Sequence, residues 1–226
     1  DNIILEGAQG TMLDVDLGTI PDVTSSHLLS YNAFASLGLP RNKFKVYGVE
    51  KIYPTRVGDG VLPTLSTDGF GDIVGDRAQE FGASTGRKRR VGYPDLVFVK
   101  RSVFLNDCDG IFLTRVDNVQ DLDIKVCVSY KNNGNQTDEV PLDLSVIEPV
   151  YFGRTFSWRL WEETLEKYPR ELSRRRAVYK MNGFNSLPKE LLAYIKLHDE
   201  YVNCKIVGVS IGPNRGDTVL REDFYK

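Results

Sequence analysis

The sequence has little of what metal sites and disulfide frameworks are made from. It contains three cysteines, Cys108, Cys127 and Cys204, which lie far apart, and it has no CxxC pair. This spacing excludes a disulfide-rich scaffold and a zinc knuckle, so we expect reduced thiols in or near the core. The two histidines, His27 and His198, stand alone in the sequence and indicate no metal site.

An excess of positive charge and long apolar runs are also missing. Lys and Arg number 29 against 31 Asp and Glu, which gives a net charge of −2. Proteins that live on nucleic acid usually carry a clear basic excess, so we expect no nucleic-acid partner. The longest apolar runs fall far short of the roughly 18 residues of a membrane span, and no segment resembles a signal peptide. We therefore expect a cytoplasmic protein that does not contact a membrane.

What remains is an ordinary globular composition. The 226 residues are 41% hydrophobic and 27% charged, which is enough for one sizeable core. The chain begins abruptly, because Asp1 and Asn2 are followed at once by an apolar run, Ile3 to Leu5, that is typical of a buried strand. Natural domains rarely start in this way, so we expect further residues upstream.

Strands and helices alternate along the chain. Besides residues 3–5, apolar runs predict strands at residues 44–53, 110–114 and 205–210. A largely buried helix is predicted from Pro94 to about Leu105. Ser186 and Pro188 open a second helix, whose apolar stripe is Leu187, Leu191, Ile195 and Val202. This alternation predicts an α/β fold, in which ligands sit beyond the carboxyl ends of the strands.

Three further segments complete the expected structure. Residues 124–130 alternate and lead into Asn132 to Asn135, a strong hairpin signal. The stretch 158–168 carries Trp158, Trp161, Leu165 and Tyr168 at helical spacing, which predicts one apolar helix face. Residues 55–90 are rich in Gly, Asp, Ser and Thr and are predicted to form long loops with little regular structure. Because loops of that length are usually functional or disordered, and many of these side chains can donate hydrogen bonds, we favour function.

The first segment whose residues could bind a ligand is the run Glu6 to Thr11. Its glycines allow a backbone to approach a ligand closely. Gln9 offers an amide that suits a purine edge, and the hydroxyls of Thr24 to Ser26 suit a phosphate. By themselves these residues also fit a purely structural turn.

A run of four cations, Arg87 to Arg90, follows two hydroxyls and a glycine in the second segment. Arginine binds carboxylates through two parallel hydrogen bonds, so the run is interpreted as a site for a small anion. The alternative is a solvated charged surface.

Two more segments follow predicted strands. An aspartate at the end of Thr114 to Asp117 can accept both N–H groups of the guanine edge, as in guanine-reading loops of the TKxD type. The corner Ser210 to Pro213 can clamp a base with its backbone. Taken alone, the first is equally a helix cap or turn aspartate, and the second a simple turn.

Together these segments resemble one family, the adenylosuccinate synthetases. The resemblance rests on five runs in the family's order, which extend from Ile3 to about Phe224: EGAQGTMLDVDLGTIPDVTSS, PTRVGDGVLPT, EFGASTGRKRRVGYPD, LTRVD and VSIGPNRGDTVLR. The resemblance implies a large, mainly parallel α/β sheet distantly like P-loop NTPases. It also implies that residues 1–226 are the carboxyl-terminal part of a single domain whose amino-terminal phosphate-loop part is absent.

The activity that this resemblance implies is the GTP-dependent joining of L-aspartate to IMP, which yields adenylosuccinate, GDP and phosphate in purine biosynthesis. GTP would be a co-substrate, Mg²⁺ would be the metal, with ligands mostly in the absent part, and the full-length enzyme would be a homodimer.

The resemblance also assigns residues to the three substrates. IMP would contact Gln9, Thr24 and Arg87. Aspartate would be received by Val57 and a mobile loop of Ala83, Ser84, Thr85, Gly86, Arg87, Lys88 and Arg89. GTP would be held by Arg89, Arg115, Val116, Asp117, Ser210, Ile211 and Gly212.

The chain departs from the family pattern at several places. Arg115 stands where a lysine is usual, residues 27–34 are bulkier than the glycine-rich segment expected there, and residues 158–176 match poorly around Arg174 to Arg176. The glycine-rich phosphate loop is absent, together with the general-base Asp, the catalytic His and the magnesium ligand that accompany it. We therefore expect no catalytic residue in this sequence and no synthetase activity from it alone.

Two other functions stay open at this stage. One is a catalytically inactive module that binds purine and guanine nucleotides for regulation. The other is a viral relative that acts on a guanine nucleotide in place of IMP.

Overall fold

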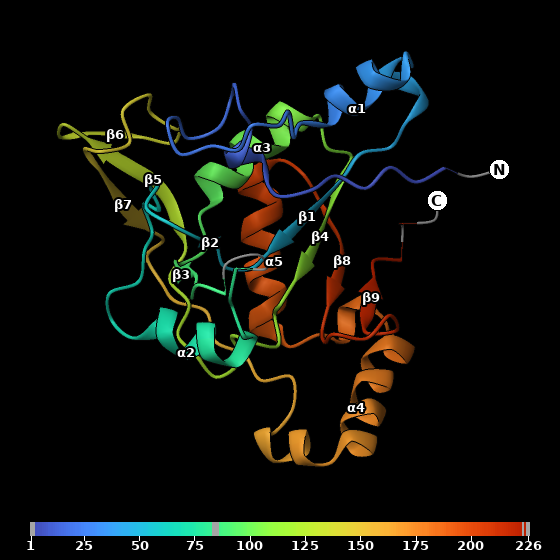
Figure 1. The fold of residues 1–226 in the computed structure, drawn as a ribbon. Helices are drawn as coiled ribbons and strands as arrows, with labels where there is room; N and C mark the ends of the chain where they lie inside the picture. The colour runs from blue at the N-terminus through green and yellow to red at the C-terminus, as the bar shows by residue number, and fades with distance from the viewer. Residues whose placement is uncertain (1–2, 83–85, 223, 225–226) are drawn as a thin grey trace.

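The computed structural model describes residues 3–82, 86–222 and 224. Its main sheet has the strand order β1-β4-β8-β9 (Figure 1), with β1 at Tyr47–Lys51, β4 at Gly110–Thr114, β8 at Ile206–Ser210 and β9 at Thr218–Leu220. The first three strands are parallel and β9 is antiparallel to β8. The mainly parallel α/β sheet predicted from the sequence is therefore confirmed.

Two small antiparallel sheets accompany the main one. β2 (Thr55–Arg56) pairs with β3 (Arg90–Val91), and β5 (Cys127–Asn132) lies between β6 (Asn135–Thr137) and β7 (Ile147–Tyr151). The predicted hairpin turn is confirmed between β5 and β6, where Asn133 and Gly134 both have positive φ, as a tight two-residue turn requires.

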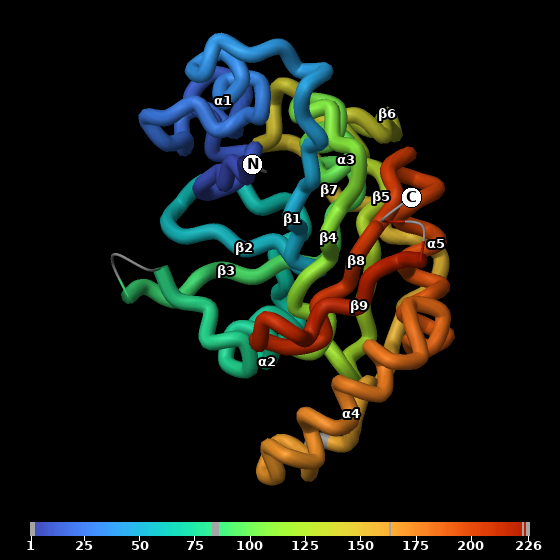
Figure 2. The backbone as a smooth tube through the Cα atoms, turned by 90° about the vertical axis from the view of Figure 1, so that its right-hand side faces the viewer, coloured from blue at the N-terminus to red at the C-terminus, as the bar shows by residue number. Residues whose placement is uncertain are grey.

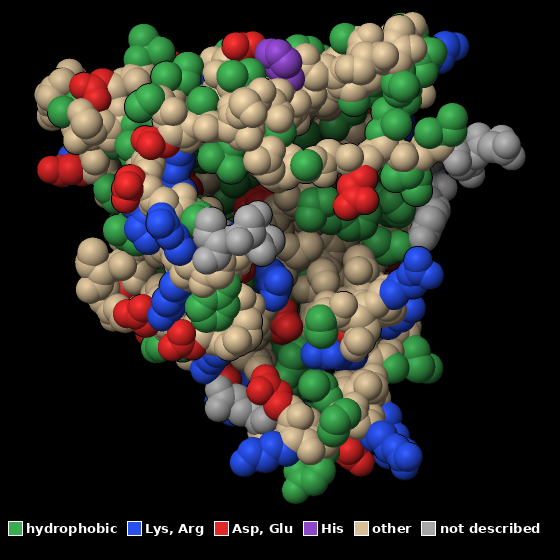
Figure 3. Space-filling model, viewed as in Figure 1, with side chains coloured by type: hydrophobic (Ala, Val, Ile, Leu, Met, Phe, Trp, Pro, Cys, Tyr) green, Lys and Arg blue, Asp and Glu red, His purple; other side chains and the backbone are tan. Residues whose placement is uncertain are grey.

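Helices cover one face of the main sheet. α5 (Lys189–Val202) lies on one side of the strands, and α3 (Leu96–Asn106) packs beside it and against β5 (Figure 2). The stripe predicted for α5 is confirmed, since Leu187, Leu191, Ile195 and Val202 are all buried in the main core. On the opposite face, Tyr47 and Val49 of β1 are exposed, Val49 to 77%, and hydrophobic side chains are visible at the centre of Figure 3.

The remaining elements lie at the two ends of the sheet. α1 (Ser30–Leu37) and the short 3-10 helices η1 (Thr11–Leu13) and η2 (Arg41–Lys43) lie at the top of Figure 1, and α2 (Phe70–Ala78) lies at the bottom. α4 (Pro169–Asn182), flanked by the 3-10 helices η3 (Glu163–Lys167) and η4 (Phe184–Ser186), extends away from the rest of the molecule in Figures 1 and 2. No residue of α4 is buried.

Several sequence predictions are wrong in detail. Residues 3–5 form no strand and Ile4 is 91% exposed, so the apolar run is not buried by the described residues. Residues 55–90 contain α2, whose Phe70, Val74 and Ala78 are buried at helical spacing. Residues 158–162 are not helical, although both tryptophans are buried. The predicted strand over residues 44–53 is confirmed only for Tyr47–Lys51.

The helix predicted from Pro94 to Leu105 is confirmed as α3, but only Leu96 and Val97 of it are buried and Phe104 is 80% exposed. Asp95 starts this helix by accepting a hydrogen bond from the backbone N–H of Phe98, and it also accepts one from the Tyr130 hydroxyl. Burial raises the pKa of Asp95 to about 6, although both hydrogen bonds oppose this shift.

This carboxyl should make stability depend on pH. Because its folded-state pKa lies above the value of 3.8 for a free carboxyl, the unfolded chain ionises first as the pH rises. Its stabilising contribution is therefore complete below about pH 4 and is lost as the pH rises through 6. Relative to Asp95→Asn, the wild-type protein should lose about 2 kcal/mol between pH 4 and pH 7. Denaturant unfolding of both proteins at several pH values measures this difference, and parallel pH curves would contradict it.

Candidate functional site

The carboxyl ends of the three parallel strands bring most of the predicted residues to one edge of the sheet. β1 ends at Lys51, which pairs in register with Thr114 at the end of β4, and β8 ends at Ser210. α2 and α4 flank this edge, as Figures 1 and 2 show. The predicted guanine residues lie on one side of it, and the predicted aspartate loop lies beside β2 and β3.

The predicted guanine loop leaves β4 through a residue in the left-handed region. Arg115 has a φ of 66° and is exposed, whereas Val116 behind it is buried and accepts a hydrogen bond from Trp158 Nε1 at 3.0 Å. Asp117 is partly buried, and its Oδ1 accepts a 3.4 Å hydrogen bond from Asn118 Nδ2. Burial raises the pKa of the Asp117 carboxyl, while Arg176 and Arg115 act in the opposite direction.

The corner after β8 completes this side of the edge. The Ser210 hydroxyl donates to the carbonyl of Gly212 at 3.0 Å, and the backbone N–H of Ile211 donates to the carbonyl of Asp217 at 2.8 Å. These two bonds fix the turn from β8 to β9, so the predicted residues Ser210, Ile211 and Gly212 are held in one place.

Arg176 of α4 was not predicted to belong to the site. Its Nη1 lies 3.1 Å from Asp217 Oδ2, and its guanidinium lies 5.0 Å from the centre of the Trp161 ring. A Cβ atom added to Gly212 would stand 2.5 Å from the Arg176 Cζ, so guanidinium and backbone are in close contact. The run Arg174 to Arg176 was noted in the sequence only as a mismatch to the family pattern, and the contact of Arg176 with Asp217, just before β9, depends on the tertiary fold.

The predicted IMP residues Gln9 and Thr24 are brought together. Gln9 Nε2 donates to Thr24 Oγ1 at 3.2 Å, and the backbone N–H of Thr24 donates to the carbonyl of Leu13 at 2.9 Å. Both side chains are accessible, and Gln9 has a φ of 60°, which turns the chain sharply beside Gly10.

Arg56 of β2 ties this purine loop to the rest of the edge. Its guanidinium donates to the hydroxyl of Thr19 at 2.7 Å and to the carbonyls of Val61 and Asp22. Arg56 pairs in register with Arg90 of β3, which follows directly on the predicted aspartate loop. This arginine was missed because nothing in its local sequence indicates its partners.

A buried carboxylate organises the positive charges at the end of β1. Glu80, 5% exposed, is an ion-pair partner of Lys51 at 3.1 Å and of Arg89 at 3.7 Å, and it accepts a hydrogen bond from the Tyr53 hydroxyl at 3.1 Å. Burial lowers the pKa of Lys51, which Glu80 partly offsets, and burial and Glu80 raise the pKa of Tyr53. Arg89 also donates to the carbonyl of Phe81 at 3.0 Å, so this cation is held firmly beside Lys51.

The rest of the predicted aspartate loop is only partly described. Ala83, Ser84 and Thr85 lie outside the described residues. The loop is closed by hydrogen bonds from the N–H of Gly82 to the carbonyl of Arg87 at 2.8 Å and from the N–H of Gly86 to the carbonyl of Gly82 at 2.9 Å. The side chain of Arg87 is exposed, and Val57 is also exposed.

Lys88 of the same loop points to α2. Its Nζ lies 3.0 Å from Asp76 and 3.3 Å from Asp72, and these carboxylates raise the pKa of the ammonium, Asp76 first. An aspartate-binding role for Lys88 therefore requires that the side chain leave these partners, and it stays a prediction.

One group of side chains in the described part of the chain has the spacing of a metal site. Oxygen and nitrogen atoms of Asp14, Asp16 and His27 lie within 4.8 Å of one another. Both oxygens of Asp14 are already used, since they accept hydrogen bonds from the backbone N–H groups of Asp16, Leu17 and Leu28. This group caps a turn and does not fit Mg²⁺, which requires free carboxylate oxygens.

Across the described ranges, no helix is both long and apolar enough to cross a membrane.

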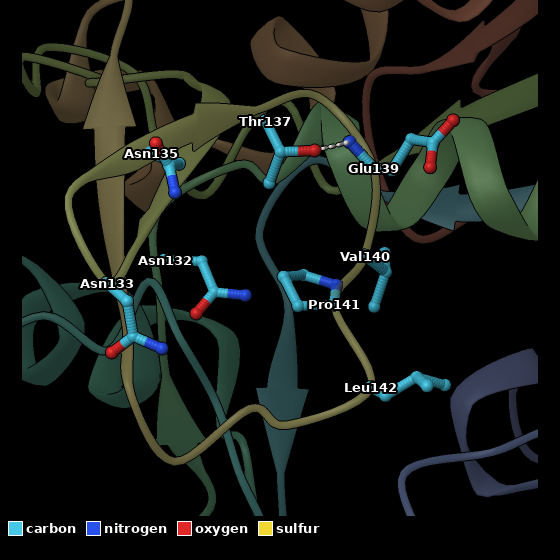
Figure 4. Close-up of a pocket in the computed structure, with 8 residues that line it drawn as sticks. All are labelled: Asn132, Asn133, Asn135, Thr137, Glu139, Val140, Pro141 and Leu142. Carbon is cyan, nitrogen blue, oxygen red and sulfur yellow. Dashed lines mark hydrogen bonds between the residues drawn. The ribbon is translucent and has the colours of Figure 1, made fainter.

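A cavity of about 430 Å³ lies elsewhere, beside the β5–β6 hairpin (Figure 4). It is lined by three asparagines and by the segment that follows β6: Asn132, Asn133, Asn135, Thr137, Glu139, Val140, Pro141 and Leu142. None of the residues that were predicted to bind a substrate lines it.

Comparison with known proteins gives consistent matches. A family model described as adenylosuccinate synthetase matches residues 1–219. The adenylosuccinate synthetase of Parabacteroides distasonis is 39% identical over 223 residues, which are 97% of this chain and 49% of that protein. The enzyme of the same name from Stenotrophomonas maltophilia is 36% identical over 225 residues, which are 99% of this chain and 49% of that protein. The chain thus spans about half the length of the curated relatives it matches.

Solved structures agree with these matches. The fully ligated adenylosuccinate synthetase from Plasmodium falciparum superposes with a TM-score of 0.81 at 32% identity, over 96% of this chain and 49% of that one. The succinoaminodeoxyadenylate synthetase of cyanophage S-2L, solved with dGMP and with dATP as an energy donor, superposes with a TM-score of 0.52 at 17% identity, over 95% and 45%. The second likeness extends to the fold alone.

Proposed function

This chain belongs to the adenylosuccinate synthetase family, and on that premise we propose that it supplies substrate-binding parts of a ligase that joins L-aspartate to IMP. The energy would come from GTP, and the products would be adenylosuccinate, GDP and phosphate. We also propose that residues 1–226 form the carboxyl-terminal part of a single domain, because the matched relatives are about twice as long.

One observation carries this proposal: a chain of contacts connects residues predicted for the three substrates, from the purine loop to the carboxyl edge of the sheet. The Gln9–Thr24 pair belongs to the loop that Arg56 holds at Thr19 and Asp22. Arg56 pairs with Arg90, and the preceding Arg89 lies with Lys51 around Glu80. Lys51 pairs in register with the end of β4, where the guanine loop begins. Three ligands placed at these positions would lie in sequence along this chain of contacts.

The residue types suit the chemistry. The 6-oxo group of IMP is a poor leaving group, and transfer of the γ-phosphoryl group of GTP to that oxygen makes it a good one. The amine of aspartate then attacks C6, forms the C–N bond and displaces phosphate. Such transfer depends mainly on positioning and on stabilising charge, which amides, hydroxyls and arginines provide. Since the group of Asp14, Asp16 and His27 does not fit Mg²⁺, the role derived for this chain is to bind and orient substrates.

The test uses the complete polypeptide as it is encoded. With IMP, GTP, Mg²⁺ and L-aspartate, we expect an absorbance change from adenylosuccinate and release of one phosphate per product. Omission of aspartate should abolish the product. Nucleotide binding without product would instead identify a regulatory module, and product formed with dGMP but not with IMP would identify a relative that acts on a guanine nucleotide.

A further inference from the structure

α4 is a charged arm, and one of its cations turns inward. Arg170, Arg174 and Arg175 are exposed, and Lys and Arg side chains are visible around this arm in Figure 3. In contrast, the side chain of Arg176 is only 11% exposed and that of its partner Asp217 only 10%. Arg176 therefore connects α4 to the edge of the sheet formed by the carboxyl ends of the parallel strands.

The guanidinium of Arg176 has more donors than its neighbours use. It carries five N–H groups in a rigid fork, and the bond to Asp217 engages Nη1. The buried Nε has no acceptor among the described residues. The Trp161 ring and the backbone of Gly212 both lie against the guanidinium and restrict its movement, so the remaining donors are held in place.

An acceptor with spare capacity lies nearby. Asp117, three residues after the end of β4, accepts one long bond from the Asn118 side chain and one from its own backbone N–H, which leaves lone pairs free. Arg176 is close enough to Asp117 for its charge to favour the ionised carboxylate. Asp217, by contrast, is occupied, because it also accepts bonds from the backbone and side chain of Asn214.

The donors of Arg176 and the acceptor oxygens of Asp117 together match the hydrogen-bonding edge of guanine. Guanine presents two donors, N1–H and the 2-amino group, next to one acceptor, O6, whereas adenine offers a donor at position 6 and an acceptor at N1. We propose that Arg176 is a specificity-determining residue for the guanine base, whose O6 accepts a hydrogen bond from the Arg176 guanidinium while Asp117 accepts from N1–H and the 2-amino group. This assignment rests on the proposed function, because it requires the base of GTP at this site. Asp217 acts as a positioning residue, since it holds the fork in place.

The test compares nucleotides that differ by single groups on this edge. 6-Thio-GTP keeps N1–H and the amino group but replaces O6 by sulfur, a weak acceptor, whereas ITP keeps O6 and lacks the 2-amino group. Dissociation constants are measured for the complete polypeptide by displacement of a fluorescent GDP analogue. The wild-type protein should prefer GTP over 6-thio-GTP by about tenfold, as expected for loss of a charge-assisted hydrogen bond.

Two variants separate this contact from a structural role. Arg176→Leu removes the guanidinium, and Arg176→Lys keeps a cation for Asp217 but has no rigid fork. In both, the ratio between GTP and 6-thio-GTP should fall to about one, while the ratio between GTP and ITP stays at its wild-type value. Arg174→Leu, an exposed position on the same helix, is the matched control and should behave as wild type.

Three other outcomes would contradict either the O6 contact or the proposed function. A wild-type protein that does not distinguish GTP from 6-thio-GTP, or variants that keep the wild-type ratio, would overturn the O6 contact and leave the proposed function intact. A parallel loss of affinity for all three nucleotides in Arg176→Lys would assign Arg176 a purely structural role and would also overturn it. Failure of the wild-type protein to bind any of them would contradict the proposed function itself.

Discussion

Replacement of Asp117 by asparagine is expected to change the base preference of the nucleotide site from guanine to xanthine. The carboxylate can accept both N1–H and the 2-amino group of guanine, and asparagine presents one acceptor and one donor instead. The 2-amino group would then face an amide N–H, whereas the 2-oxo group of xanthine would accept from it. Loss of the charged acceptor should lower kcat/KM for GTP by about 100-fold, and use of XTP should rise.

The measurement is kcat/KM for GTP and XTP in the complete enzyme. Asp121→Asn is a suitable control, because Asp121 lies four residues further along the same loop, has a positive φ that asparagine tolerates, and forms an exposed ion pair with Arg159. An unchanged ratio between GTP and XTP in Asp117→Asn would show that this carboxylate does not contact the base.

Substitution of Arg87 by leucine should produce the second large effect. The exposed guanidinium stands in a loop closed by the Gly82–Arg87 hydrogen bond, where a substrate carboxylate would meet Arg87 and Arg89. Removing one partner of a charged, desolvated pair costs about 2–5 kcal/mol, so KM for aspartate or IMP should rise at least about 30-fold and turnover should fall.

The stability of the Arg87→Leu protein should stay within about 0.5 kcal/mol of wild type, because the side chain is exposed. Lys131→Leu, an exposed cation on β5, serves as the control for loss of one surface charge. Wild-type kinetic constants for both substrates in Arg87→Leu would contradict the assignment.

Helices, strands and turns that depend on local sequence patterns were predicted well. β4 is confirmed at residues 110–114, because Ile111, Phe112 and Thr114 have high strand propensity and the run stands between polar neighbours. α5 was identified from its apolar stripe, and the β5–β6 turn from Asn133 and Gly134, which tolerate positive φ. In each case a short window contains the whole signal.

Elements shaped by distant partners were predicted poorly. Trp158 and Trp161 fall at helical spacing, but they are buried in an extended segment held by other parts of the chain: Trp158 Nε1 donates to Val116, and the backbone N–H of Trp161 donates to Gln120. α2 was missed because Gly69, Gly71 and Gly75, which stand before and within it, conceal a buried stripe that begins at Phe70. Exposure of Ile4 was equally unpredictable, since an apolar run alone does not say what covers it.

The same division applies to the candidate site. Gln9, Thr24 and Asp117 were predicted because they stand in specific motifs; Gln9 and Thr24 are in contact, and their roles stay predictions. Glu80 and Arg176 were missed because their importance lies in partners 29 and 41 residues away, Lys51 and Asp217. No local pattern marks a buried carboxylate that holds two cations, so only the tertiary structure identifies such residues.

The close contact between Gly212 and Arg176 also constrains how this protein can evolve. Gly212 does not have a positive φ, so its backbone conformation would accept any residue. The Arg176 guanidinium and the Asp217 carboxylate, each 2.5 Å from where its Cβ would be, both oppose a side chain there. A lineage that keeps the Arg176–Asp217 ion pair in this place is therefore expected to keep glycine at 212, and a side chain at 212 becomes acceptable only after both groups have been lost or have moved. Substitutions at position 212 should consequently follow changes at positions 176 and 217, and the three positions should covary among descendants that retain α4.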